Sequence, residues 1–341
     1  MALRKTSSAR PEILEVSPQA AIPGGEFQIR GKGLAGAGRP QARFGDAPAA
    51  VVIGSDSYVV VRVPDGVSAG ELFLGSNGGP TWTCQIGVQI ADGVHPVSNP
   101  VVDRRGVTYT TLSGSAGQKT PVSVFKLDVS GHLKPLVTDL MNATGLALDS
   151  SQTLYVSSRN DGVVYQVSAS GSRVPYVEGM GVATGIVFDA EDNLYVGDRS
   201  GTIFKISRQR QIYVFATIEP SLAAYHLALG PDGFLYVTGP TTSSFDSIAR
   251  ISKEGRVERF YRGLGRPQGL AFDVKGNLYV AASLSGRRGV VRVTPEAEAE
   301  LFLSGPSIVG LAFTPSKALI LATNSLLYRV NAGIEGFRMP E

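Results

Sequence analysis

The chain has 341 residues, a net charge of +3, 18% charged residues and 41 glycines. This length allows a substantial apolar core in more than one domain, and the basic residues are too few and too scattered for a nucleic-acid track. No run approaches the roughly eighteen consecutive apolar residues of a transmembrane helix, and the single cysteine excludes a disulfide within the chain.

Residues 1–10 are polar and basic, and we expect them to be disordered. They provide the basic start of a signal peptide, but no apolar stretch follows, so the sequence as given predicts no signal peptide. Two hypotheses for the compartment stay open. The protein is either cytoplasmic, or a trimmed form of an exported protein.

Residues 11–92 read as short strands separated by Gly and Pro turns, a pattern typical of an Ig-like β-sandwich. Trp82 and Cys84 are two residues apart, so we expect both on one strand face and in the core. The strands are expected in PEILEVSP from Pro11, PGGEFQIRGKGL from Pro23, RFGDAPAAV from Arg43, VVVRVPDGVSAGELFL from Val59, and 82–90.

Residues 95–341 contain six related segments spaced by 40 to 46 residues. Each combines an apolar stretch, a polar turn and, in the clearest copies, Leu-Tyr-Val, followed by a third run in which apolar and polar residues alternate. Most units add a fourth run, so this content predicts four strands per unit and a six-bladed β-propeller. Small residues in the first strand suit a crowded central axis. The segments begin at Ser98, Thr144, Thr184, Tyr225, Gln268 and Val309.

The repeated motif is G-(L/I)-x-(F/L)-D, then (N/T)-L-Y-V, then (I/V)-x-(K/R/Q)-(I/V)-S. It resembles the repeat of SMP-30/gluconolactonase-like and NHL-type propellers over about residues 95–341. Residues 11–92, with Pro-Gly-Gly, Gly-x-Gly-Leu and Phe-Gly-Asp in order, resemble an IPT/TIG domain. The resemblance implies an all-β protein with an N-terminal Ig-like domain and a six-bladed propeller, modules often found outside the bacterial membrane.

In SMP-30/gluconolactonase-like enzymes, the residue before the conserved glycine faces the channel, and Glu, Asn and Asp side chains from different blades hold a divalent cation. The six matching positions here are the segment starts given above, and none of them is a carboxylate. A hard cation needs anionic oxygen ligands. We therefore expect no metal, no cofactor and no catalytic residue of that type, and without a metal the activated water for lactone hydrolysis is lost.

The same ring is nevertheless a candidate ligand site at the channel mouth. Tyr225, His226 and Gln268 come from adjacent units and combine an aromatic face with hydrogen-bonding groups. His226 replaces the inner-strand glycine of its unit, either to fill space or to contact a ligand. The remaining candidates are the ring hydroxyls and a pair on the rim, namely Ser98, Thr144, Thr184, Asp198 and Arg199.

Two functions remain open. The first is a non-catalytic binding or scaffold protein for a protein partner, a carbohydrate or a small polar ligand, with no nucleic acid involved. The second is a divergent SMP-30/gluconolactonase-like hydrolase acting on lactones. The absent carboxylates favour the first.

Overall fold

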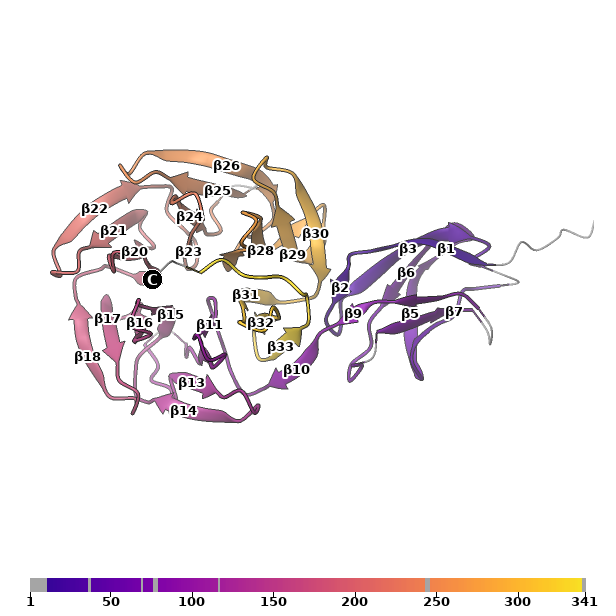
Figure 1. The fold of residues 1–341 in the computed structure, drawn as a ribbon, viewed down its shortest axis with the longest axis horizontal. Coiled ribbons are helices and arrows are strands. Elements are labelled where there is room, and N and C mark those ends of the chain that lie inside the picture. The colour runs from indigo at the N-terminus through magenta and orange to yellow at the C-terminus, as the bar shows by residue number, and fades with distance from the viewer. Residues whose placement is uncertain are drawn as a thin grey trace, which may run out of the picture. The chain divides into compact units, whose positions relative to one another are not determined.

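The computed structural model describes residues 11–35, 38–68, 70–75, 79–115, 117–242 and 246–338, so the disorder expected for residues 1–10 lies outside it. The described residues are all-β, without a helix that is able to cross a membrane (Figure 1). Contacts divide the chain into two compact units, Met1–Val88 with Leu301–Pro306, and Gln89–Glu300 with Ser307–Glu341.

Seven strands of the N-terminal unit form one hydrogen-bonded sheet. The sheet nearly closes on itself, because its first and last strands lie next to each other. β5 links the two halves, since its first residues pair with β4 and its later residues pair with β6. β2 (Ala20–Ala21) and β9 (Gln85–Ile86) pair in parallel. The order is β1 (Glu12–Ser17), β3 (Glu26–Lys32), β6 (Tyr58–Arg62), β5 (Ala47–Gly54), β4 (Ala42–Phe44), β7 (Glu71–Leu74) and β8 (Thr81–Thr83).

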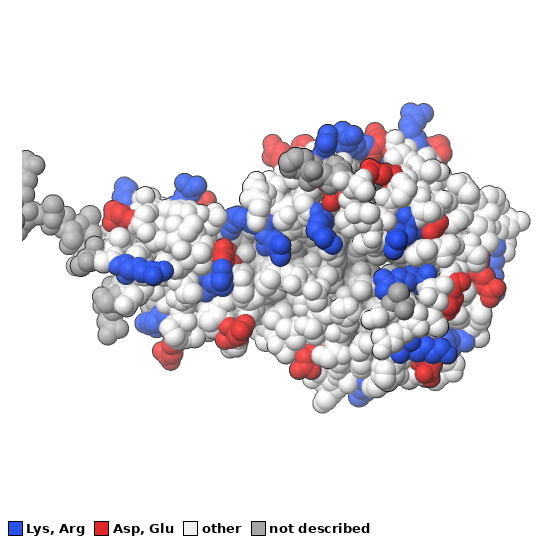
Figure 2. Space-filling view, turned by 180° about the vertical axis from the view of Figure 1, so that it is seen from behind, with Lys and Arg blue, Asp and Glu red and all other residues white. Residues whose placement is uncertain are grey.

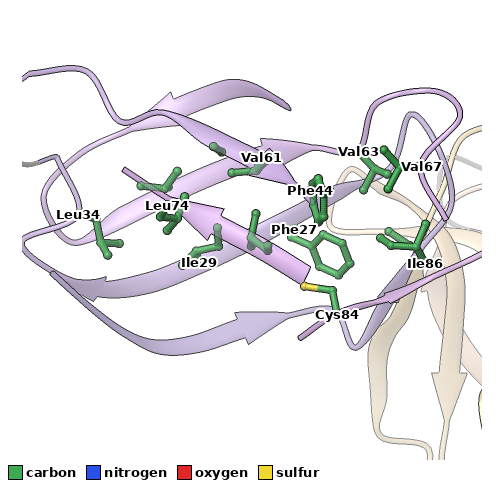
Figure 3. Close-up of a cluster of buried hydrophobic side chains, with 14 residues drawn as sticks. Phe27, Ile29, Leu34, Phe44, Val61, Val63, Val67, Leu74, Cys84 and Ile86 are labelled. Carbon is green, nitrogen blue, oxygen red and sulfur yellow. The ribbon is translucent and has the colours of Figure 1, made fainter. Parts of the chain in front are cut away.

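Alternating apolar residues of these strands form the core of the unit (Figure 3). Phe27 and Phe44 are fully buried, with ring centroids 6.0 Å apart. Cys84 is buried as predicted, and burial raises the pKa of its thiol to about 12. The prediction for Trp82 is wrong: the residue is 38% exposed, because β8 ends at Thr83 and the alternation of faces does not continue to Cys84.

The second unit is a propeller-like arrangement of sheets around an axis (Figure 1). Each sheet runs from an inner strand outward through consecutive antiparallel strands. The sheets contain β11 (Val101–Val102), β12 (Thr108–Thr111), β13 (Val124–Leu127) and β14 (Leu133–Val137); β15 (Ala143–Leu148), β16 (Leu154–Ser158), β17 (Val163–Val167) and β18 (Arg173–Val177); β19 (Ala183–Phe188), β20 (Leu194–Asp198), β21 (Thr202–Ile206) and β22 (Ile212–Thr217); β23 (His226–Leu229), β24 (Leu235–Thr238), β25 (Asp246–Ile251) and β26 (Val257–Leu264); and β27 (Leu270–Phe272), β28 (Leu278–Leu284), β29 (Arg287–Val293) and β30 (Ala299–Ser304).

The last sheet closes in a way that the repeat did not predict. It consists of β31 (Ile308–Phe313), β32 (Leu319–Thr323) and β33 (Leu327–Val330), and its fourth strand is β10 (Val88–Ala91) from far earlier in the chain. The described residues after β33, up to Arg338, therefore add no outer strand. They run instead toward the axis, as the yellow end of the ribbon shows (Figure 1).

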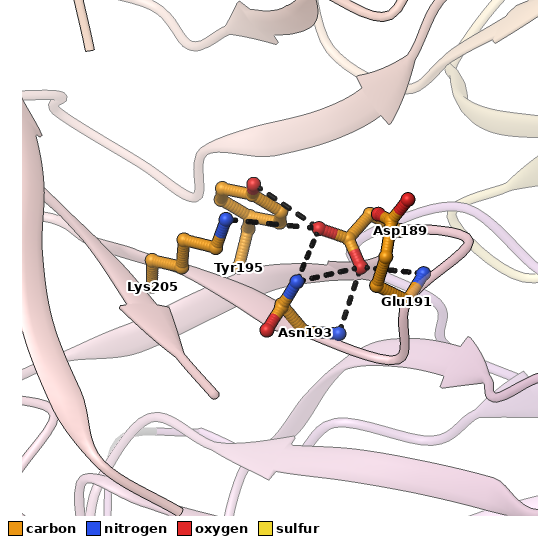
Figure 4. Close-up of polar contacts among 5 residues, drawn as sticks. All are labelled: Asp189, Glu191, Asn193, Tyr195 and Lys205. Atoms are coloured by element: carbon orange, nitrogen blue, oxygen red, sulfur yellow. Dashed lines mark hydrogen bonds and ion pairs between the residues drawn. The ribbon is translucent and has the colours of Figure 1, made fainter. Parts of the chain in front are cut away.

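The Asp and Tyr of the repeated motif hold the turn between the first two strands of a sheet (Figure 4). Asp189 accepts hydrogen bonds from the backbone N–H groups of Glu191 and Asn193, at 3.1 and 2.8 Å, and from the Tyr195 hydroxyl at 3.3 Å. Burial, with the neighbouring carboxylate, raises the pKa of Tyr195, which keeps the hydroxyl a donor. The same contacts recur at Asp149 with Thr153 and Tyr155, and at Asp273 with Asn277 and Tyr279.

The tyrosine rings also join neighbouring sheets. Tyr155 packs against Phe188 of the next inner strand with a centroid distance of 4.7 Å, and Tyr236 packs in the same way against Phe272. Such tilted aromatic pairs contribute about 0.5–1.5 kcal/mol each beyond the area that they bury. One motif thus serves both the local turn and the contact between sheets.

We predict that Asp189→Ala lowers the free energy of unfolding by roughly 2–4 kcal/mol, because several buried donors lose their acceptor. Tyr195→Phe removes one hydroxyl and should cost about 1 kcal/mol. Urea denaturation measures both effects, and Glu191→Ala on the same turn is the control, since its side chain is exposed. If Asp189→Ala and the control were equally stable, the turn would not depend on the carboxylate.

Candidate functional site

The inner strands of the second unit surround a cavity of about 300 Å³. The small residues that the sequence placed at a crowded axis line the middle of its wall, and a cavity remains between them. These residues are Ala147, Val187, Ala228, Ala271 and Ala312.

Adjacent inner strands approach each other closely at the conserved glycines. A Cβ on Gly145 would lie 2.3 Å from the carbonyl oxygen of Thr184, and a Cβ on Gly185 would lie 2.4 Å from that of Tyr225. Only glycine fits at such a distance. Asn99 occupies the corresponding position of the first repeat and His226 that of β23, so these two residues depart from glycine in this layer.

His226 is a buried polar residue in the lining of the cavity. The residue lines the cavity, is 3% exposed, and its Nδ1 has no hydrogen-bond partner among the described residues. Burial lowers its pKa to about 4, so the ring is neutral at pH 7. A neutral imidazole offers one donor and one acceptor to a ligand.

The ring hydroxyls bond to backbone atoms. Ser98 Oγ donates to the Thr144 carbonyl oxygen at 2.6 Å, which ties one sheet to the next. Thr144 Oγ1 donates to the Asn142 carbonyl oxygen at 2.9 Å. Thr184 Oγ1 donates to the Gly197 carbonyl oxygen at 2.8 Å and accepts from the Tyr225 backbone N–H at 3.1 Å. Both threonines are fully buried and contribute nothing to the cavity wall, whereas Ser98 lines it.

Tyr225 belongs to the core between sheets: it is 2% exposed, and its hydroxyl donates to the Glu219 carbonyl oxygen. Gln268 is half-buried, and its carbonyl oxygen accepts from the Thr238 hydroxyl. Neither residue lines the cavity. Of the three neighbours grouped from the sequence, His226 is the one that the cavity includes.

Asp198 is the last residue of β20 and Arg199 follows it, and neither lines the cavity. Asp198 is 7% exposed and accepts from the Val182 backbone N–H at 2.9 Å and from Ser200, so it caps its own loop. Arg199 is exposed. Burial lowers the pKa of Arg159, and the nearby charge of Arg199 lowers it further. On the side opposite to the view of Figure 1, Lys and Arg side chains border a hollow (Figure 2).

The donor set of the ring does not fit the divalent cation that the resemblance implies. The ring offers hydroxyls, one amide and the apolar Val309, and its Ser and Thr hydroxyls already donate to backbone carbonyls. Within the described ranges, no three His, Cys, Asp or Glu side chains gather as metal ligands.

Sequence reasoning missed the other end of the cavity. Arg104, between β11 and β12, lines this end together with Phe337 and Arg338 of the C-terminal segment. The segment is held by Phe337 N–H, which donates to the Phe272 carbonyl oxygen at 2.8 Å. No periodic signal marks Phe337 and Arg338, because they follow the last repeat.

We predict that acid destabilises the protein through His226. Its pKa is near 6.5 when unfolded and about 4 when folded, so the stability that the neutral ring contributes is present above pH 6.5 and is lost as the pH falls toward 4. Between pH 7.5 and 5, the wild type should lose about 2 kcal/mol more than His226→Gln does. Urea unfolding at both values measures this, and equal losses would contradict a buried neutral ring.

Comparison with solved structures identifies gluconolactonase-like and virginiamycin-lyase-type β-propellers as similar folds. A gluconolactonase from Xanthomonas campestris matches with a TM-score of 0.62 and 15% identity over 72% of this chain and 89% of that chain. An auxiliary nutrient binding protein from Bacteroides thetaiotaomicron matches with a TM-score of 0.56 and 12% identity over 94% and 97%. A catalytically inactive histidine-to-alanine variant of virginiamycin B lyase from Staphylococcus aureus, with quinupristin, matches with a TM-score of 0.53 and 13% identity over 96% of each chain. No family model matches the sequence, and no curated protein matches it significantly. At these identities, the likeness concerns the fold alone.

Proposed function

We propose that this chain is a non-catalytic binding protein that holds a small molecule in the axial cavity of its second unit. The observation that carries the proposal is His226, a buried and neutral imidazole that belongs to the lining of the cavity. A neutral imidazole in a mostly apolar wall is a directional hydrogen-bonding group.

The size and wall of the cavity support a small ligand. A cavity of about 150 Å³ binds benzene, so about 300 Å³ suits roughly twelve non-hydrogen atoms. The alanine and valine side chains of the wall give the many hydroxyls of a sugar no partners, so a compact, partly apolar molecule fits better than a glycan. The similar fold of a nutrient binding protein agrees with a binding role.

We further propose the finer architecture that the motifs imply. The sheets of the second unit are the blades of a six-bladed propeller over residues 95–341, and β10 completes the last blade. Residues 11–92 are an IPT/TIG-like Ig domain, in which β5 divides its pairing between two halves of the sheet, as strands that change sheets do.

We predict that filling the cavity abolishes binding. Ala271→Leu places a larger side chain in the wall, while Ala169→Leu changes an exposed turn and serves as the matched control. Ligand-observed NMR with a library of fragments of up to about twelve non-hydrogen atoms should give hits that compete with one another for the wild type and the control. A wild type without hits, or a folded Ala271→Leu that keeps them, would overturn the proposal.

The second candidate function is a divergent lactone hydrolase, favoured by the fold shared with a gluconolactonase. This function requires a tightly bound cation of the family type, and the ring residues are poor ligands. We therefore predict no stoichiometric heat of binding for Ca²⁺, Zn²⁺ or Mn²⁺ in calorimetry, and no hydrolysis of gluconolactone above the uncatalysed rate with any of them. Tight binding accompanied by turnover would establish the hydrolase instead.

A further inference from the structure

Two arginines occupy the same position of the repeat in neighbouring sheets of the second unit. Arg159 follows Leu-Tyr-Val-Ser-Ser and Arg199 follows Leu-Tyr-Val-Gly-Asp, so each is the first residue after the second strand of its sheet. Ser158 pairs with Ala143 at the start of β15, which places Arg159 at the end of the sheet opposite to the turn between the first two strands. The repeat thus brings two guanidinium groups to one face of the unit.

Both arginines lie beside the segment that leads into β19. Ser157, two residues before Arg159, donates from its hydroxyl to the Thr184 carbonyl oxygen at 2.6 Å. The backbone N–H of Arg199 donates to the Val182 carbonyl oxygen at 3.2 Å, two residues before that threonine. The two loops therefore meet the same short stretch of chain, one from each side.

The two guanidinium groups are close enough to act on each other. Burial lowers the pKa of Arg159, and the nearby charge of Arg199 lowers it further. Arg159 is half-buried, while Arg199 is exposed. Arginine nevertheless stays protonated at neutral pH, so the two positive charges repel each other. An anion between them relieves this repulsion.

The carboxylates next to these arginines in the sequence are used by their own loops. Asp161 accepts from the Ser158 hydroxyl at 3.0 Å, and Asp198 accepts from the Val182 backbone N–H at 2.9 Å. Within the described ranges, neither arginine side chain has a carboxylate partner. The donors of both guanidinium groups are therefore open to an anion from solution.

The face that carries the two arginines is hollowed and has a basic border. The C-terminal segment lies nearest to the viewer in Figure 1, and it pairs through Gly336 with Asp273 at the other end of the inner strands. Figure 2 therefore shows the face of Arg159 and Arg199, and Lys and Arg side chains border a hollow there. A concave surface lined by one sign of charge attracts ions of the opposite sign more strongly than a flat one.

The shape of the anion follows from the number of guanidinium groups. A guanidinium binds an oxyanion best through two parallel hydrogen bonds. A carboxylate has two oxygens, which suffice for one such pair. A phosphate or sulfate group has additional oxygens, so it can meet two guanidinium groups that come from different sheets, and its two negative charges match the two cations.

We propose that Arg159 and Arg199 form a binding site for a doubly charged tetrahedral oxyanion, a phosphate or sulfate group. Each arginine supplies one guanidinium, and the oxyanion lies between the two loops. Neither arginine lines the axial cavity, so this site is separate from the proposed small-molecule site and does not rest on it.

The test is calorimetry on the full chain with inorganic phosphate, sulfate and acetate. A low ionic strength and a pH of about 8 keep phosphate doubly charged and limit the screening of the exposed arginine. We expect phosphate, sulfate or both to bind about tenfold or more tightly than acetate, which has one charge and two oxygens. The tighter of the two identifies the group that the site prefers.

Arginine variants locate the anion. Arg159→Gln with Arg199→Gln should weaken binding of the preferred ion about tenfold or more, because both pairs of charge-assisted hydrogen bonds are lost. The control is Arg256→Gln with Arg259→Gln, which makes the same change in net charge at two exposed arginines in and just before the outer strand β26. This control should stay within about twofold of the wild type.

Three outcomes overturn the site: no binding of phosphate or sulfate, acetate binding as tightly as they do, or an equal loss in the arginine pair and its control. Ala271→Leu provides a further check, because it fills the axial cavity and should leave the affinity for the preferred ion unchanged. Loss of that affinity in folded Ala271→Leu would place the ion in the cavity and overturn the assignment to Arg159 and Arg199. The fragment screen tests the cavity independently of these arginines.

Discussion

The second unit depends on the contact in which a motif tyrosine donates to the aspartate of its own turn while its ring packs against the next sheet. At Tyr155, the hydroxyl bonds to Asp149 at 3.2 Å, and the ring lies 4.7 Å from that of Phe188. Each hydrogen bond and ring pair contributes only about 1 kcal/mol. Their repetition at Tyr155, Tyr236 and Tyr279 couples three of the turns to the next inner strand.

Much of this could be predicted from the sequence, because turn chemistry and alternation are local. The motif located the hairpins, and small residues such as Ala147 and Ala271 indicated the part of each first strand that lies at the crowded axis. Alternation alone does not say which face of an inner strand points to the axis and which to the next sheet. Thr144 and Thr184 illustrate this: their hydroxyls bond to backbone atoms away from the cavity, while the glycines beside them line it. The path of the C-terminal segment could not be predicted from the sequence either, because it depends on a close contact between Gly336 and Phe313.

The state of His226 explains why a binding role suits this cavity better than acid–base catalysis. A general acid or base is most effective with a pKa near the working pH. Burial moves the pKa of His226 to about 4, and the described residues provide no partner for Nδ1 that would orient or recharge the ring. A neutral imidazole in an apolar wall is a poor proton carrier, but it is a directional hydrogen-bonding group.

The polar side chains that give this cavity its specificity lie where the sequence repeat is interrupted. The repeated residues build an almost featureless wall of alanine and valine, which by itself would select ligands only by size and hydrophobicity. Specificity needs polar groups whose loss would leave a buried partner unsatisfied. His226 stands where four of the other repeats have glycine, and Arg338 lies beyond the last repeat, so neither is required by the packing that the repeat maintains. Substitutions at these two positions can therefore change the ligand without changing the fold that holds it.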